Sequence, residues 1–192
     1  MKNTTLLLLI AITAMGFGAS AQIQKGNLMV GGNIANINLG LNDPKIFSVD
    51  VTPKVAWFIE DNIALGGYAQ FGLEAAKHTS TSTSYGIGAL GRYYAGPAGE
   101  LISHGRFFAE ATAGFGGVNV SGADNTNGLN LSAGPGFAYF ITPNIGLEVL
   151  LKYNGLVGLG STPYQNNLNL SFGFQIYLPG RSTAKKVEND FK

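Results

Sequence analysis

The sequence contains no cysteine, which excludes both a disulfide framework and a lipid-modified N-terminal cysteine. Charged residues make up 12% of the 192 positions, about half the ~25% that is typical of a soluble domain. Without Lys2, eleven Lys and Arg balance eleven Asp and Glu, so no excess of positive charge points to a nucleic-acid partner. Beyond residue 21, no apolar run approaches the ~18 residues that a membrane-spanning helix needs.

The first 21 residues have the features of a secretory signal peptide. Lys2 gives a positive start, an apolar stretch follows over 6–14, and Ala19-Ser20-Ala21 forms a cleavage site of small residues. We therefore expect residues 1–21 to be removed, residues 22–178 to form one domain, and residues 179–192 to be a polar periplasmic tail after Pro179-Gly180.

Apolar and polar residues alternate in eight segments, which predicts strands with two different faces. The longest uninterrupted example is FSVDVTPKVAWFI at 47–59, in which every odd residue except Pro53 is a large apolar one. The eight predicted strands are 28–39, 47–59, 63–75, 85–94, 107–118, 129–141, 145–153 and 167–178. In the first of them the parity switches between Ile34 and Ile37, which we interpret as a bulge near Gly31-Gly32, and Pro53 predicts a second bulge.

Short and long connections alternate between these segments. The residues EDN at 60–62 and TPN at 142–144 predict tight turns, whereas 76–84, 119–128 and 154–166 are long and polar. This alternation is typical of a bacterial outer-membrane barrel, in which the short turns face the periplasm. The link at 95–105 is long on the short side, and we expect local structure there.

The polar row of the strands consists mainly of Gly, Ser, Thr, Asn and Gln with about one charge per strand, unlike an ordinary hydrated surface. Eight strands close around an interior that side chains can fill, and an unpaired ion buried there costs several kcal/mol. We therefore predict an all-β fold, an eight-stranded antiparallel transmembrane β-barrel in an up-and-down meander, with lipid outside and a plug of ion pairs inside. The predicted interior charges are Asp50, Lys54, Glu74, Arg92, Glu110, Glu148 and Lys152.

Aromatic residues lie near the ends of several predicted strands, as they do in the girdles of membrane barrels. The predicted interfacial aromatics are Phe47, Trp57, Tyr85, Tyr93, Phe107 and Phe115. A soluble barrel of the lipocalin kind, with the apolar row inward, is the alternative orientation.

At this point the sequence resembles the small eight-stranded outer-membrane β-barrel proteins of Gram-negative bacteria, the OmpX/OmpA-like family. The resemblance is carried by TPKVAWFIEDNIALGG (52–67), GIGALGRYY (86–94), RFFAEATAGFG (106–116), GPGFAYFITPNIGLEVLLKYN (134–154) and NLNLSFGFQIYL (167–178). It implies a cell outer-membrane location, contact with lipid and lipopolysaccharide, and assembly by the barrel-assembly machinery. It also implies a non-enzymatic envelope or surface-binding role without a cofactor, the extracellular ligand being unknown. Members usually end on an aromatic residue of the last strand, whereas this chain continues past Leu178.

Two motifs carry possible chemistry. The glycines of GIGALG at 86–91 have dinucleotide-loop spacing, but they lie within a predicted strand that no helix follows, so we assign them to packing. His78 and Ser80 resemble the H-x-S pair of an outer-membrane lipid A deacylase, which leaves a lipid-modifying hydrolase as one alternative. A narrow porin or transporter for small or hydrophobic molecules is the other. His104 has no ligand partner at useful spacing, and no metal site is predicted.

Overall fold

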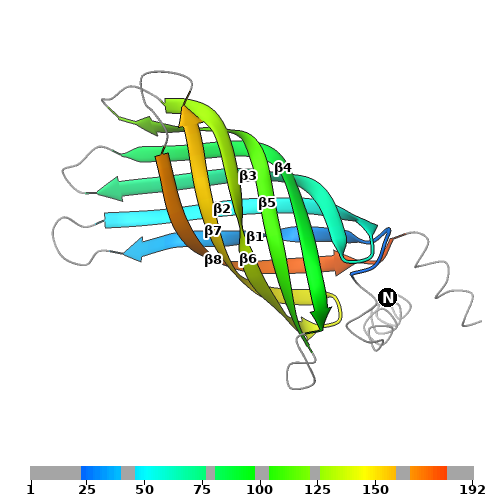
Figure 1. Cartoon of the computed structure of the whole chain (residues 1–192). Helices are drawn as coiled ribbons and strands as arrows, with labels where there is room; N and C mark the ends of the chain where they lie inside the picture. Colours follow the sequence, from blue (N-terminus) through cyan, green and yellow to red (C-terminus); the bar gives the residue numbers. More distant parts are fainter. Residues whose placement is uncertain are drawn as a thin grey trace, which may run out of the picture.

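The computed structural model describes residues 23–39, 46–76, 81–97, 104–121, 126–158 and 165–180. These residues form eight antiparallel strands that pair in chain order and close into one barrel (Figure 1). The strands are β1 (Leu28–Leu39), β2 (Ile46–Glu60), β3 (Ile63–Ala76), β4 (Ser82–Pro97), β5 (Gly105–Val120), β6 (Thr126–Thr142), β7 (Ile145–Gly158) and β8 (Gln165–Leu178). Within these ranges no helix is long and apolar enough to cross a membrane.

The pairing of the first strand with the last one closes the barrel. β1 pairs with β8 in a single register from Leu28 opposite Leu178 to Ala35 opposite Ser171. The eight-stranded meander predicted from alternation is therefore confirmed. We refer to the end that carries the β2–β3 and β6–β7 turns and the start of β1 as the turn end, and to the opposite end as the loop end.

Tight turns at the turn end follow from their residues. Asp61 and Asn62 connect β2 to β3, and Asn62 has a φ of 68°, a left-handed conformation that Asn tolerates better than most residues. We expected local structure over 95–105. Residues 95–97 extend β4 and Gly105 begins β5, while residues 98–103 lie outside the described residues.

The two predicted bulges are placed differently by the structure. The β1–β2 register shifts between Ala35 and Asn38, so the parity switch does mark an irregularity, but our assignment of it to Gly31-Gly32 is wrong. No bulge occurs at Pro53 either. The β2–β3 pairing omits Thr52 and Pro53 and resumes at Lys54 in the same register. The pairing is thus interrupted where proline has no N–H to donate, without an extra residue in the strand.

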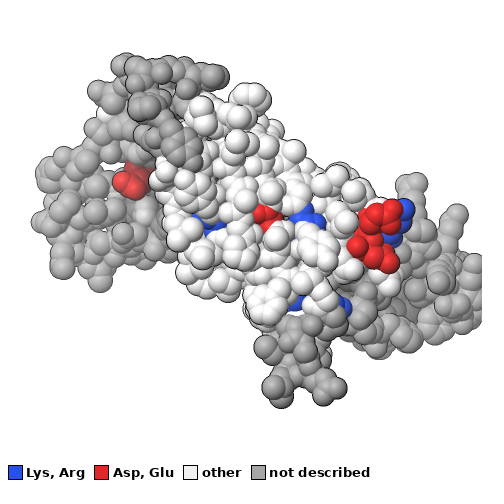
Figure 2. Space-filling model, viewed as in Figure 1, with Lys and Arg blue, Asp and Glu red and all other residues white. Residues whose placement is uncertain are grey.

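The barrel presents its apolar row outward. Trp57, Phe71, Phe115 and Leu168 are between 54% and 67% exposed, whereas Arg92, Glu110 and Glu148 are 2% exposed and face the interior. Charged atoms accordingly show on the visible wall only as small patches among uncharged residues, and the largest charged group lies at the turn end (Figure 2). This distribution is the reverse of that in a soluble barrel, where charges cover the outside.

Inward glycines make room for large side chains of neighbouring strands. A Cβ on Gly136 of β6 would lie 2.2 to 2.7 Å from three ring carbons of Phe108 on β5. The Phe108 ring in turn packs against the guanidinium of Arg92, whose Cζ is 4.1 Å from the ring centroid. Gly136 therefore positions an aromatic ring that supports a buried charge.

Gly136→Ala should destabilise the barrel by about 1–3 kcal/mol, because the added methyl group must displace the Phe108 ring. Gly96→Ala is the matched control, since a Cβ there meets nothing within 4 Å. Urea unfolding of the two variants in the same micelles measures the difference. In the double variant Gly136→Ala/Phe108→Leu the two costs should not add, and strict additivity would contradict the proposed contact.

The segment before β1 is attached to the turn end of the barrel. Gly26 N donates to the Phe58 carbonyl (2.7 Å), Phe58 N to the Asn27 carbonyl (2.9 Å), and Asn62 N to the Ile23 carbonyl (2.9 Å). Lys25 pairs with Glu60 at 2.6 Å, and this contact raises the pKa of the Lys25 ammonium. Ile23 is only 3% exposed, so the segment contributes to the core.

Asn27 connects the segment before β1 to the residues after β8, because its side-chain Oδ1 accepts a hydrogen bond from Gly180 N at 2.9 Å. Asn27→Ala should cost about 1–2 kcal/mol of unfolding free energy, since the half-buried N–H of Gly180 loses its acceptor. Gln24→Ala, which removes a side chain from an exposed neighbour, should change little. Equal urea midpoints for the two variants would show that the Asn27 contact contributes nothing.

Candidate functional site in the barrel interior

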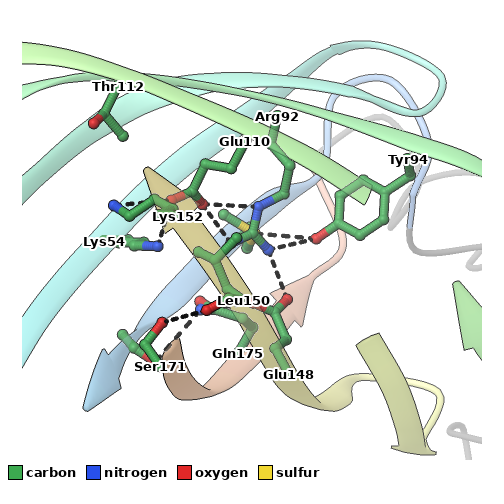
Figure 3. A network of polar contacts seen from close by, with 12 residues as sticks. Lys54, Arg92, Tyr94, Glu110, Thr112, Glu148, Leu150, Lys152, Ser171 and Gln175 are labelled. Carbon is green, nitrogen blue, oxygen red and sulfur yellow. Dashed lines mark hydrogen bonds and ion pairs between the residues drawn. The ribbon is translucent and has the colours of Figure 1, made fainter. Parts of the chain in front are cut away.

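Five ionisable side chains from four strands meet at mid-height inside the barrel (Figure 3). They are Lys54 of β2, Arg92 of β4, Glu110 of β5, and Glu148 and Lys152 of β7, and we refer to them as the ion cluster. Arg92 and Glu110 stand directly opposite each other in the β4–β5 register, and the others reach across the lumen. Alternation brought all five to the same side of the sheet because every second residue faces inward.

Arg92 is the centre of the ion cluster. Its Nη2 lies 2.6 Å from Glu110 Oε2, and its Nη1 lies 2.6 Å from Glu148 Oε1. Its side chain and those of both carboxylates are 0% exposed. Lys54 Nζ holds the other oxygen of Glu110 at 2.6 Å, and Lys152 Nζ approaches that oxygen at 3.7 Å. The charges therefore satisfy one another within the barrel, as buried ions must.

A ring of hydrogen bonds extends the ion cluster toward the turn end. Arg92 Nη1 donates to the Tyr94 hydroxyl at 2.8 Å, and the Tyr177 hydroxyl donates to Glu148 Oε1 at 3.1 Å. The two hydroxyls are 2.7 Å apart, so Tyr94 donates to Tyr177 once the Tyr177 proton is used on Glu148. Gln175 Nε2 donates to the second oxygen of Glu148 at 3.3 Å.

Below this ring, aromatic side chains fill the turn end of the lumen. Phe140 and Tyr177 have ring centroids 5.1 Å apart, Tyr94 and Phe108 5.5 Å, and Phe58 and Tyr94 6.0 Å. Our prediction of interior residues considered charges and did not include these rings. Their signal was present in the sequence, because each is an aromatic residue on the polar row of its strand.

Two of the predicted interior charges do not belong to the ion cluster. Asp50 lies four residues nearer the loop end than Lys54, about 13 Å along the strand, and its Oδ1 accepts a hydrogen bond from Ser84 at 3.4 Å. Glu74 is exposed near the loop end of β3. Parity assigns a side to each residue but not its height in the barrel, which explains both placements.

Five of the six predicted interfacial aromatics have described side chains, and all five are exposed on the outer wall: Trp57, Tyr85, Tyr93, Phe107 and Phe115. On β4 and on β5 the two aromatics are eight residues apart, which corresponds to about 26 Å along the strand. With the usual tilt of 35–45°, the two levels are about 20 Å apart in height, close to the apolar band of a membrane barrel. The side chain of Phe47 is not among those that the structure describes.

The structure does not place the candidate catalytic pair, since His78 and Ser80 lie outside the described residues. His104 is described, and its ring lies 6.3 Å from that of Tyr139 at the turn end. Within the described ranges, no group of three or more His, Asp or Glu side chains could hold a metal ion.

Solved structures with the same architecture fit this geometry. Neisserial surface protein A matches with a TM-score of 0.55 at 16% identity, covering 78% of this chain and 95% of that chain. This chain has the fold of the small outer-membrane β-barrels. The N-terminal barrel domain of Pseudomonas aeruginosa OprF (TM-score 0.53, 14% identity) covers 80% of this chain and 98% of its own. OprG of the same organism matches with a TM-score of 0.52 at 9% identity, covering 81% of this chain and 97% of that chain. No protein-family model and no curated protein matches the sequence.

Proposed function

We propose that the chain is an integral protein of the outer membrane without enzymatic activity, a closed cylinder that holds its loop end at the cell surface. The observation that carries this proposal is the inverted distribution of side chains. Large apolar residues such as Ile87 and Phe172 are 69% and 59% exposed on the wall, while the ions are buried. Lipid tails are the solvent that makes such a wall stable.

The interior geometry supports an envelope or surface-binding role over transport. The ion cluster and the aromatic layer together occupy the lumen from mid-height to the turn end. An ion crossing the barrel would have to displace Arg92 from two carboxylates. The partners proposed on this basis are outer-membrane lipid, lipopolysaccharide and the assembly machinery, after removal of residues 1–21.

Cell fractionation combined with gel migration tests the proposal. We expect the protein in the outer-membrane fraction, with different migration before and after boiling in detergent, because a closed barrel resists detergent unfolding at room temperature. Recovery from the soluble periplasmic fraction would refute the membrane assignment. In planar bilayers we expect no conductance steps from the folded protein, and regular steps would favour a porin-like function.

A further inference from the structure

Among the described residues, side chains leave part of the loop-end half of the lumen open. A cavity of about 200 Å³ lies between the ion cluster and the loop end. This volume corresponds to about seven water molecules at ~30 Å³ each, the size class of a monosaccharide. Its lining includes the two lysines of the ion cluster, Asp50 and six amide side chains: Asn33, Gln70, Asn130, Asn154, Asn167 and Asn169.

Asn33 is a buried polar side chain in the wall of this cavity. It is 4% exposed, and neither its Nδ2 nor its Oδ1 has a hydrogen-bond partner among the described residues. Buried amides are nearly always hydrogen-bonded. Both amide atoms of Asn33 are themselves buried, so a ligand in the cavity reaches them only when the side chain turns toward it, and this turn breaks no hydrogen bond to a described residue. A hydroxyl group, which both donates and accepts, satisfies either atom of the amide.

Lys152 gives the cavity a cationic floor. The ion cluster holds three cations and two carboxylates, so it carries one positive charge in excess. Lys152 is its most exposed member, at 14%, and its recorded ion pair is the longest, 3.7 Å to an oxygen that Lys54 already holds at 2.6 Å. Of the cations in the cluster, Lys152 is therefore the one that an anionic group of a ligand would pair with most easily.

We propose that the cavity is a binding site for an acidic monosaccharide, with its hydroxyl groups on the amide wall and its carboxylate on Lys152. Asn33, turned toward the ligand, would bind hydroxyl groups whatever the charge of the sugar, and Lys152 would select the acid. Asp50, nearer the loop end, would disfavour a second anionic group. Neither the cavity nor its lining depends on the membrane location of the barrel, so this proposal can be tested on purified protein.

The test uses the full chain folded in detergent micelles, with ¹⁵N-labelled side-chain amides observed by NMR. Galacturonate should shift the Asn33 amide signals saturably, and galactose should bind about tenfold more weakly, the factor that ~1.4 kcal/mol provides. Lys152→Gln should reduce galacturonate binding to the level of galactose, whereas Lys152→Arg should retain the preference. Asn33→Ala should weaken both sugars.

Two results would overturn the proposal. Neither sugar shifting the Asn33 signals saturably would show that the cavity is not a sugar site. Equal affinities of the wild-type protein for galacturonate and galactose would remove Lys152 as the selecting group. Both comparisons use the wild-type protein, so they remain decisive even where a Lys152 variant does not fold. Failure of the sugar test leaves the fractionation result unaffected, and the converse also holds.

Discussion

Arg92→Met should destabilise the barrel by about 3–5 kcal/mol or more, the loss expected when one partner of a buried ion pair is removed. Arg92 makes ion pairs with both carboxylates of the ion cluster. In its absence Glu148 retains only the neutral donors Gln175 and Tyr177 among its recorded partners, at 3.3 and 3.1 Å. A carboxylate buried with neutral donors alone is costly.

Equilibrium unfolding in urea, followed by the fluorescence of the chain's single tryptophan, measures this loss. Lys25→Met is the matched control, because it breaks an ion pair of the same 2.6 Å length whose side chains are 64% and 61% exposed. Its cost should be about 0–1 kcal/mol. Equal midpoints for Arg92→Met and Lys25→Met would contradict the structural role of the ion cluster.

The double variant Arg92→Met/Glu148→Gln separates charge from packing. Neutralising Glu148 removes the stranded negative charge, so the double variant should be more stable than Arg92→Met alone. The coupling energy between the two positions then measures the ion pair itself. Additive losses would mean that Arg92 contributes through its other contacts, the ion pair with Glu110 and its packing on Phe108.

Much of this fold could be predicted from alternation alone, because one face of each strand differs chemically from the other. The thirteen residues of 47–59 specify which side chains point inward, and a one-residue slip would reverse them all. The predicted strand boundaries are less accurate at the loop end of the barrel. β6 begins at Thr126 and not at 129, since Thr126-Asn127-Gly128 has no apolar residue to extend the pattern.

The interior was harder to predict, because it depends on the stagger of the strands. Lys54 and Asp50 share a parity on β2, yet only Lys54 reaches Glu110. The stagger arises from closure of the sheet, to which all eight strands contribute, and a single segment does not contain it. The aromatic layer could have been anticipated, since Phe58 and Phe140 interrupt polar rows where a lipid-facing role is excluded by parity.

Ala111→Arg should destabilise the barrel, because it places a charge on the face that we propose meets lipid. Ala111 is exposed on the outer face of β5, midway between the interfacial aromatics Phe107 and Phe115. Its partners in register are Gly91 and Ala133, so an arginine there meets small neighbours and not a steric barrier. In a bilayer this position is near the midplane, where Arg costs about 2–4 kcal/mol.

Asn119→Arg is the control, with arginine introduced on the same face of the same strand, four residues beyond Phe115 toward the loop end. At that depth the cost should fall to about 0–1 kcal/mol. Urea unfolding from lipid vesicles compares the two. If water and not lipid covered the wall, both arginines would be surface substitutions within about 0.5 kcal/mol of each other. Equal costs would therefore refute the membrane orientation.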